Sequence, residues 1–280
     1  MDIQWYPGHM NKAKRLMRES LPLVDLVVEI VDARIPASSR NPDFNALFSK
    51  KQRIVILNKA DMADPEASSL WERKFREQGI YAMSADSRSG KMSGFSQLVL
   101  KALSDKIERY KQRGMVNPPI RMMVAGIPNS GKSTFINRMS RSNKAQAEDR
   151  PGVTRQNRWF VTKDGFEMLD TPGVLWPKFK NNTVALHLAF TGAVKDQILD
   201  LEGLACGLLA ILLDDYPKML IERYKLTDDL PQDNFELLKL IGRQRGMLMS
   251  GGVVDTERAA VMLLDEFRGG KIGRITLERP

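Results

Sequence analysis

Apolar runs alternate with amphipathic segments along the first 170 residues of the chain. Short apolar runs, which predict buried strands, cover residues 23–31, 53–57, 80–83, 120–125, 158–162 and 166–169. Segments with helical spacing or helix-start signals cover residues 11–19, 41–48, 64–78 and 95–113. Strands that alternate with helices in this way predict an α/β fold with a doubly wound, mostly parallel sheet.

The pattern changes after Trp176 and Pro177. Strand-like runs disappear, and a helical period dominates around residues 184–190, 204–213, 235–241 and 256–267. We therefore expect two domains. The first is an α/β domain over residues 1–176, in which residues 1–22 form a basic leader, and the second is a small all-α domain over residues 177–280.

Composition is that of an ordinary globular protein, with 42% hydrophobic and 28% charged residues among 280. The single cysteine, Cys206, excludes an internal disulfide framework and fits a reducing compartment. The first residues lack a signal-peptide pattern, and the most apolar stretch, residues 203–213, is too short to cross a bilayer. We expect a cytoplasmic, monomeric protein with no membrane contact.

Positive charge is concentrated in the α/β domain. The net charge is +9, and residues 1–176 hold 29 Lys and Arg against 19 Asp and Glu, whereas the remainder holds 14 against 15. A basic domain favours a polyanionic partner such as RNA, although a merely solvated basic face remains open. Candidate phosphate contacts are Lys12, Lys14, Arg15, Arg18, Arg138, Arg141, Lys144, Arg150, Arg155 and Arg158, with Arg243, Arg245, Arg268, Lys271 and Arg274 in the helical domain.

Residues 126–133 (GIPNSGKS) follow a predicted strand, precede a helical pattern and fit G-x-x-x-x-G-K-[ST]. Glycines let successive backbone N–H groups turn inward around an anion, and the helix N-terminus adds its positive end. Lys132 can reach the β- and γ-phosphates, and the Ser133 hydroxyl can bind Mg²⁺. The phosphate-binding candidates here are Asn129, Ser130, Gly131, Lys132, Ser133 and Thr134.

A second phosphate-sensing loop is predicted at residues 170–173 (DTPG), directly after a strand. Asp170 can hold the Mg²⁺ shell through a water, and the Gly173 N–H can meet the γ-phosphate. Between the two loops, Thr154 can contact both Mg²⁺ and the γ-phosphate as a switch, an expectation that rests on its position.

Residues 58–61 (NKAD) are expected to select which nucleotide base is bound. Asp61 can accept from the ring N–H and the exocyclic amine of guanine together, whereas adenine offers no such pair and would leave the carboxylate unpaired. Asn58 can tie this loop to the phosphate loop, and the stem of Lys59 can lie over the base. A backbone N–H of Ser84 or Ala85 would back up the guanine carbonyl, although this pair is weakly specific.

These elements resemble those of the translation-factor-related GTPases, but the guanine loops precede the phosphate loop, as in circularly permuted GTPases. Three further features make the resemblance specific to one family: residues 5–10 (WYPGHM), residues 32–36 (DARIP) and the helical tail. The whole chain resembles the ribosome-biogenesis GTPase A (YlqF/RbgA) family. This resemblance implies a GTP-binding, GTP-hydrolysing assembly factor for the large ribosomal subunit precursor that binds ribosomal RNA in a nucleotide-dependent way.

Hydrolysis needs a group other than the glutamine that often follows Asp-x-x-Gly, because Val174 and Leu175 stand there. The resemblance points to His9 as catalytic, with a low intrinsic rate that the partner raises. It also implies that Asn129 can help to hold K⁺ near the phosphates, although a loop-capping role is equally open. His187 lies in an apolar helical pattern and reads as a packing residue.

Two other functions remain open from the residues alone. A GTPase switch could act in another RNA-related process, such as RNA modification. A P-loop kinase is the third reading, but residues 58–61 argue against it, because most such enzymes use ATP and no acceptor site is visible.

Overall fold

Six strands form one sheet in the computed structural model, which describes residues 8–90, 92–115, 119–140, 158–177, 179 and 181–280, with only the backbone at residues 8 and 9. The strands are β1 Leu26–Asp32, β2 Gln52–Asn58, β3 Tyr81–Ala85, β4 Arg121–Gly126, β5 Arg158–Val161 and β6 Glu167–Asp170. Their order is β3-β2-β1-β4-β6-β5, and only β5 pairs antiparallel. The prediction of a mostly parallel sheet is confirmed.

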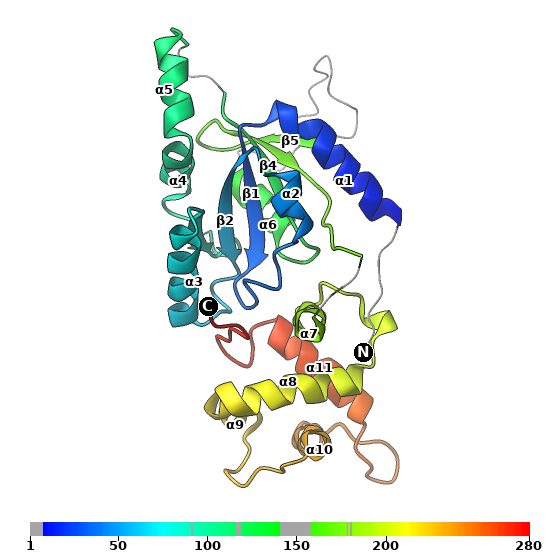
Figure 1. Cartoon of the computed structure of the whole chain (residues 1–280). Helices are drawn as coiled ribbons and strands as arrows, with labels where there is room; N and C mark the ends of the chain where they lie inside the picture. The colour runs from blue at the N-terminus through cyan, green and yellow to red at the C-terminus, as the bar shows by residue number, and fades with distance from the viewer. Residues whose placement is uncertain (1–7, 91, 116–118, 141–157, 178, 180) are drawn as a thin grey trace.

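Helices cover both faces of the sheet, as Figure 1 shows. They are α1 Gly8–Ser20, α2 Asp43–Leu47, α3 Pro65–Glu77, α4 Phe95–Ala102, α5 Ser104–Gln112 and α6 Lys132–Met139. Alternation along β1 explains this layering: Val27 belongs to the buried cluster that includes α1 and α2, whereas Val28 belongs to the cluster that includes α4 and α6. The central strand is therefore buried on both sides.

Two predicted boundaries differ from the structure. The strand expected from residue 23 begins at Leu26, because residues 21–23 form a 3-10 turn with Pro22 near its start. The single helix expected over residues 95–113 breaks at Leu103, which leaves the helical region and turns into the core at 5% exposure. Helix α5 then continues with no fully buried residue and packs on the core through the partly buried Ile107.

After β6 the described chain is helical. Its helices are α7 Asn182–Phe190, α8 Leu201–Asp215, α9 Pro217–Tyr224, α10 Asn234–Gln244 and α11 Thr256–Arg268. Helices α8 to α11 share one apolar core with Ala189 and Phe190 of α7, whereas Ala185 and Leu188 of α7 belong to the core of the α/β domain. Helix α9 was not predicted, although Pro217 in its first turn is a start signal. In the part of the chain that the structure describes, no helix could span a membrane.

Residues 270–279, which we call the strap, leave the helical domain and return to the α/β domain. The end of the chain lies beside the lower end of α3 in Figure 1. Within the strap, Ile272 and Ile275 are buried in the core of the helical domain. The Leu277 N–H donates to the carbonyl of Arg34, just beyond β1, at 2.8 Å. The strap thus belongs to both domains.

Candidate functional site

The phosphate loop connects the end of β4 to the first turn of α6. Asn129 (φ 59°) and Gly131 (φ 90°) adopt the left-handed conformation, which asparagine tolerates and glycine favours. Space also requires glycine at 131, because a Cβ there would lie 2.2 Å from the Asn58 side-chain nitrogen. The two residues turn the chain sharply before α6, so that the helix N-terminus opens directly onto the loop.

Lys132 is the first residue of α6, and its side chain points back into the phosphate loop. It is only 7% exposed, and its ammonium donates to the carbonyl of Ile127 at 2.8 Å. Burial lowers the pKa of Lys132 to about 8, with Asp170 acting in the opposite direction. Burial also raises the pKa of Asp170, although Lys132 and Arg158 oppose this change. A buried cation that lacks a full counter-charge is suited to receive a phosphate.

Gly173 follows β6 and lies against the phosphate loop. A Cβ at this position would come within 2.9 Å of the Lys132 ammonium and 2.8 Å of the Pro128 nitrogen. The next residue, Val174, donates its N–H to the carbonyl of Gly126 at 3.2 Å. The two loops expected to sense phosphate are thus in contact, and any side chain at 173 would force them apart.

The loop that follows β2 is bonded to the phosphate loop from outside. Asn58 is 2% exposed, and its amide donates to the carbonyl of Ser130 at 2.9 Å while accepting from the Ser87 hydroxyl at 2.7 Å. The Lys59 ammonium donates to the carbonyl of Asn129 at 2.6 Å. The tie expected of Asn58 is therefore present in the structure.

Lys59 also pairs with the buried carboxylate of Asp32 at 2.9 Å, and Arg34 binds the same carboxylate with two nitrogens. Burial alone would raise the pKa of Asp32, but Arg34 and Lys59 hold it well below its ordinary value. Asp32 and Arg34 belong to the segment 32–36 singled out in the sequence. Asp32 fixes the lysine that reaches across the phosphate loop.

A cavity of about 160 Å³ lies between these loops. It is lined by Asn58, Lys59, Asp61, Met62, Asp86, Ser87, Arg88, Gly131 and Thr134. Ser84 and Ala85, which were expected here, are not among these residues, and the Ser84 N–H donates to the carboxylate of Glu72 at 2.7 Å. Residues 86–88, just beyond the end of β3, lie there instead. Their position directly after the strand was the sequence signal that could have found them.

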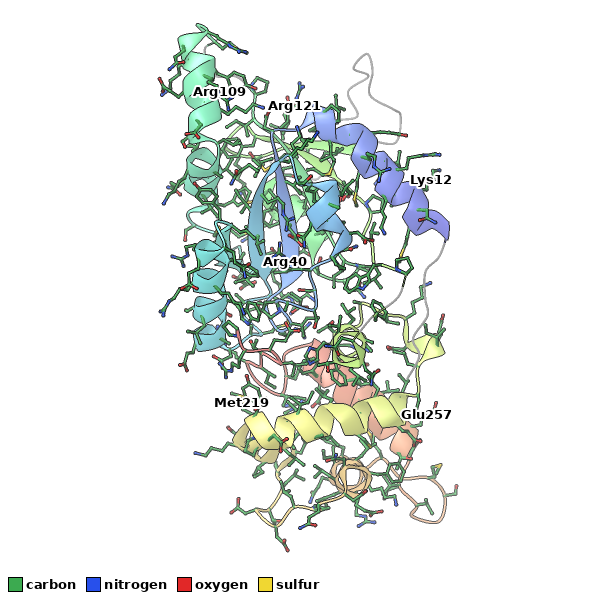
Figure 2. All side chains as sticks on the ribbon, in the orientation of Figure 1. Lys12, Arg40, Arg109, Arg121, Met219 and Glu257 are labelled. Carbon is green, nitrogen blue, oxygen red and sulfur yellow. The ribbon has the colours of Figure 1, made fainter. Side chains whose placement is uncertain are left out.

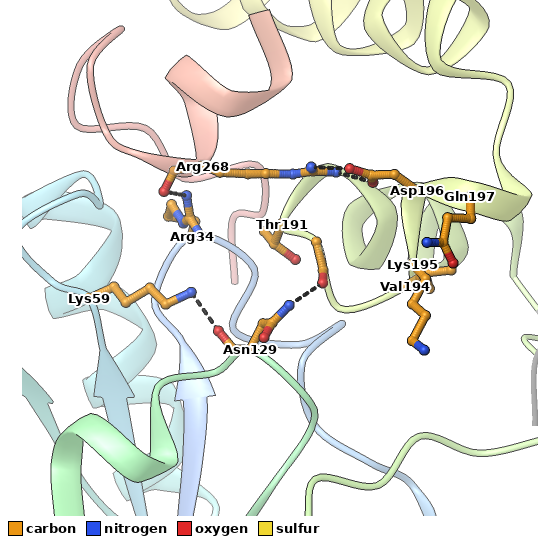
Figure 3. A pocket seen from close by; sticks show the side chains of 10 residues that line it. Arg34, Lys59, Asn129, Thr191, Val194, Lys195, Asp196, Gln197 and Arg268 are labelled. Carbon is orange, nitrogen blue, oxygen red and sulfur yellow. Dashed lines mark hydrogen bonds and ion pairs between the residues drawn. The ribbon is translucent and has the colours of Figure 1, made fainter. Parts of the chain in front are cut away.

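A second cavity, of about 490 Å³, separates the phosphate loop from the helical domain (Figure 3). On one side, the Asn129 amide donates to the carbonyl of Gly192 at 2.5 Å. On the other side of the cavity, Arg268 forms a bidentate ion pair with Asp196, with both distances 2.7 Å. Arg34 donates to the carbonyl of Arg268 at 3.2 Å. Asn129 therefore contacts the helical domain directly from the phosphate loop.

Of the three residues expected to bind Mg²⁺, Ser133 and Asp170 are described by the structure, and both suit that ion. Ser133 is exposed at the start of α6 and Asp170 is half-buried at the end of β6, and oxygen donors of these kinds are the ones that Mg²⁺ prefers. The raised pKa of Asp170 marks a carboxylate that a nearby cation would stabilise. Thr154 lies outside the described residues. Among those described, no cluster of three His, Cys, Asp or Glu side chains could hold a metal alone.

The two histidines differ in what the structure describes. The side chain of His9 lies outside it, although the backbone places residue 9 in the first turn of α1. His187 is 5% exposed, and its Nδ1 lies 3.2 Å from the Ser38 hydroxyl and 3.0 Å from a carboxylate oxygen of Glu278. His187 therefore links α7 both to the segment after β1 and to the strap. The apolar pattern around it in the sequence did not reveal this role.

A phosphate loop after β4 and a guanine-type loop after β2 (residues 58–64), joined at the same edge of a doubly wound sheet, define a P-loop GTPase. Here the guanine-type loop precedes the phosphate loop in the chain, which makes the protein a circularly permuted GTPase. A family model described as "50S ribosome-binding GTPase" matches residues 121–232.

Relatives extend the match to the whole chain. A ribosome biogenesis GTPase A from Priestia megaterium is 47% identical over 100% of this chain and 98% of its own length. One from Thermotoga maritima is 30% identical over 99% of this chain and 95% of its own. The GDP-bound structure of TM YlqF superposes with a TM-score of 0.67 at 27% identity, covering 94% of this chain and 98% of the other. The chain belongs to the ribosome biogenesis GTPase A family, and it hydrolyses GTP.

Proposed function

We propose that this GTPase acts in assembly of the large ribosomal subunit, where it binds ribosomal RNA in a way that depends on the bound nucleotide. Its similarity to ribosome biogenesis GTPase A proteins and to the family model described as a 50S ribosome-binding GTPase supports this proposal. We further propose that it works in the cytoplasm as a monomer, with the large-subunit precursor as its partner.

The exposed face of α1 supports contact with RNA. Met10, Ala13 and Met17 bury one side of this helix, and the opposite side presents Lys12, Arg15 and Arg18 to solvent. In Figure 2 the side chain of Lys12 extends outward from α1. Lys and Arg side chains arranged in this way neutralise backbone phosphates without reading sequence.

The helical domain offers fewer free cations. Arg245 pairs with Glu266, Arg268 pairs with Asp196, and Arg274 donates to backbone carbonyls. Of the candidates named above in this domain, Arg243 and Lys271 are exposed and form no ion pair within the described part of the chain. We therefore assign the main RNA contact to the α/β domain.

For the nucleotide we propose the following contacts. Asn58, Lys59 and Asp61 bind the guanine from one side, and residues 86–88 take the place expected of Ser84 and Ala85. Ser133, Asp170 and Thr154 would hold Mg²⁺, whose positive charge would stabilise the negative charge that develops on the phosphate oxygens. The phosphates lie against Asn129, Ser130, Gly131, Lys132, Ser133, Thr134, Thr154 and Gly173.

For the chemical step we propose that His9 acts on the attacking water. Residues Val174 and Leu175 are fully buried, so neither can approach a nucleotide. They belong to the same buried cluster as Met10, the residue after His9. The start of α1 and the segment that follows Gly173 thus pack into the same core. We also propose that K⁺, held in part by Asn129, assists the same step.

Co-sedimentation with ribosomal subunits tests the proposed function. We expect binding to the large subunit or its precursor with a non-hydrolysable GTP analogue, and weaker binding with GDP. Binding should be lost as the salt concentration rises from about 50 to about 200 mM, because contacts with phosphates weaken over this range. The triple variant Lys12→Ala, Arg15→Ala, Arg18→Ala should bind more weakly, with an unchanged GDP affinity. Equal binding to both subunits, or none, would favour a GTPase that acts elsewhere, for example in RNA modification.

A further inference from the structure

The guanine-type loop is bonded to the strap over most of its length. The Arg274 guanidinium donates through Nε to the carbonyl of Ala63 at 2.9 Å and through a terminal nitrogen to the carbonyl of Ala60 at 2.8 Å. Between these two, the Ile275 N–H donates to the carbonyl of Met62 at 2.9 Å. The carbonyls on both sides of Asp61 are therefore held by residues more than 200 positions later in the chain.

The strap also fixes the exit of this loop into α3. The Asp64 N–H donates to the Thr276 hydroxyl at 3.0 Å, and the Asp64 carboxylate accepts from Arg279 at 2.8 Å. Asp64 caps the first turn of α3 through the N–H groups of Glu66 and Ala67. A displacement of the strap would thus release both ends of the segment that carries Asp61.

The helical domain holds the strap from its other side. Thr276 exchanges two hydrogen bonds with Tyr216, at the junction of α8 and α9: the hydroxyl of Tyr216 donates to the carbonyl at 2.9 Å, and the N–H of Thr276 donates to that hydroxyl at 3.1 Å. Close packing accompanies these bonds, because a Cβ on Gly273 would lie 2.5 Å from the Met219 sulfur. The strap is therefore fixed to the helical domain as well as to the guanine-type loop.

The α/β domain supports the start of this loop through the bonds of Asn58 and Lys59 described above. Asp61 is exposed, and within the described part of the α/β domain the backbone of the loop is held by the bonds from the Ala60 N–H to the Ala85 carbonyl and from the Met62 N–H to the Lys59 carbonyl. A bidentate contact with a base tolerates little displacement of the carboxylate, since a misplaced partner loses most of its hydrogen-bond energy.

We propose that Arg274 is a positioning residue for guanine recognition, and that the strap holds Asp61 where it can bind both base donors. This inference rests on the proposed role of Asp61. If it is right, base specificity depends on the helical domain as well as on residues 58–61. Arg274 touches only backbone carbonyls of the loop, so it acts through Asp61 rather than on the nucleotide.

The test compares GDP with inosine diphosphate (IDP), which lacks the exocyclic amine. In Arg274→Ala, we expect the dissociation constant for GDP to rise about tenfold and that for IDP about threefold, because IDP uses less of the Asp61 carboxylate. Arg274→Lys can reach one carbonyl and should show an intermediate loss. A dissociation constant for GDP within about twofold of wild type, or an equal loss for GDP and IDP, would overturn the proposal.

Two companion variants make the result specific. Arg109 on α5 also donates its Nε to a backbone carbonyl, that of Asp105 at 3.1 Å, and lies far from the loop (Figure 2), so Arg109→Ala should bind both nucleotides normally. Asp61→Ala should abolish the preference for GDP over IDP. If Asp61→Ala keeps that preference, the proposed base contact fails; if it loses the preference while Arg274→Ala keeps it, only the strap inference fails.

Discussion

The side-chain amide of Asn58 donates to the carbonyl of Ser130 at 2.9 Å and so joins the guanine-type loop to the phosphate loop. In sequence the two residues are 72 positions apart, yet Asn58 ends β2 while Ser130 lies in the turn after β4. Parallel strands deliver their carboxyl ends to one edge of the sheet, which is why the contact is possible.

Replacing Asn58 with alanine should weaken GDP and GTP binding alike. The change leaves the buried carbonyl of Ser130 and the hydroxyl of Ser87 without this partner, at a cost of about 1–3 kcal/mol for each unsatisfied group. Titration calorimetry would show similar losses for both nucleotides, and thermal unfolding would show a lower Tm for the nucleotide-free protein. Wild-type affinity would mean that the loops hold their positions without the bond.

Asp61→Asn should change the preferred base. An amide at this position can donate to the second carbonyl of xanthine, which replaces the exocyclic amine of guanine, whereas it pairs poorly with guanine's two donors. We expect the affinity for GDP to fall by about 100-fold and that for xanthosine diphosphate to rise. Competition binding with the two nucleotides measures this, and a retained preference for GDP contradicts the assignment.

Lys132 should make GDP binding depend on pH. Its pKa in the nucleotide-free protein is about 8, below the ordinary 10.5, and phosphate oxygens raise the pKa of a lysine that they contact. Binding therefore takes up a proton above pH 8, and affinity falls as the pH rises through 8, by up to about tenfold per unit. For the free protein the sign is opposite: the unfolded chain binds more protons between pH 8 and 10.5, so this group adds stability as the pH rises there.

Calorimetry at pH 8.5 in buffers of different ionisation enthalpy measures the proton uptake directly. Lys132→Arg keeps its charge throughout this range, so whatever affinity it retains should be independent of pH. Absence of proton uptake by the wild-type protein would show that Lys132 is already charged before the nucleotide binds.

His9→Ala should lower turnover without lowering nucleotide affinity. If His9 assists proton transfer or orients the water, its loss costs about 100-fold in kcat when the ribosomal particle is present, with the GDP dissociation constant within about twofold. Single-turnover hydrolysis on the particle measures the rate. A wild-type rate there removes His9 from the mechanism.

Turnover should be faster in K⁺ than in Na⁺ at equal ionic strength, since a cation beside Asn129 would neutralise charge that develops on the phosphates. Asn129→Ala should remove the difference between the two salts. Equal wild-type rates in both salts would leave Asn129 with the role that its bond to Gly192 shows, a contact between the phosphate loop and the helical domain.

Local patterns predicted the sheet, the phosphate loop and the tie formed by Asn58, because each depends on residues close in sequence or on a motif with a fixed partner. The break between α4 and α5 at Leu103 was not predicted. A single apolar residue that turns into the core leaves the helical period of the sequence almost intact. The link between His187 and Glu278, and the bonds from Arg274 to residues 60–63, join segments whose separation gives the sequence no local signal.

The position of the strap also has a consequence for how the protein is made. Translation proceeds from the N-terminus, so residues 58–61 leave the exit tunnel long before residues 270–279 are added. Folding of the sheet can proceed during synthesis, because its strands lie in the first 170 residues. The nascent α/β domain would then carry an unsupported guanine loop until the strap emerges and docks, so selective nucleotide loading would be a property acquired only after most of the chain has been translated.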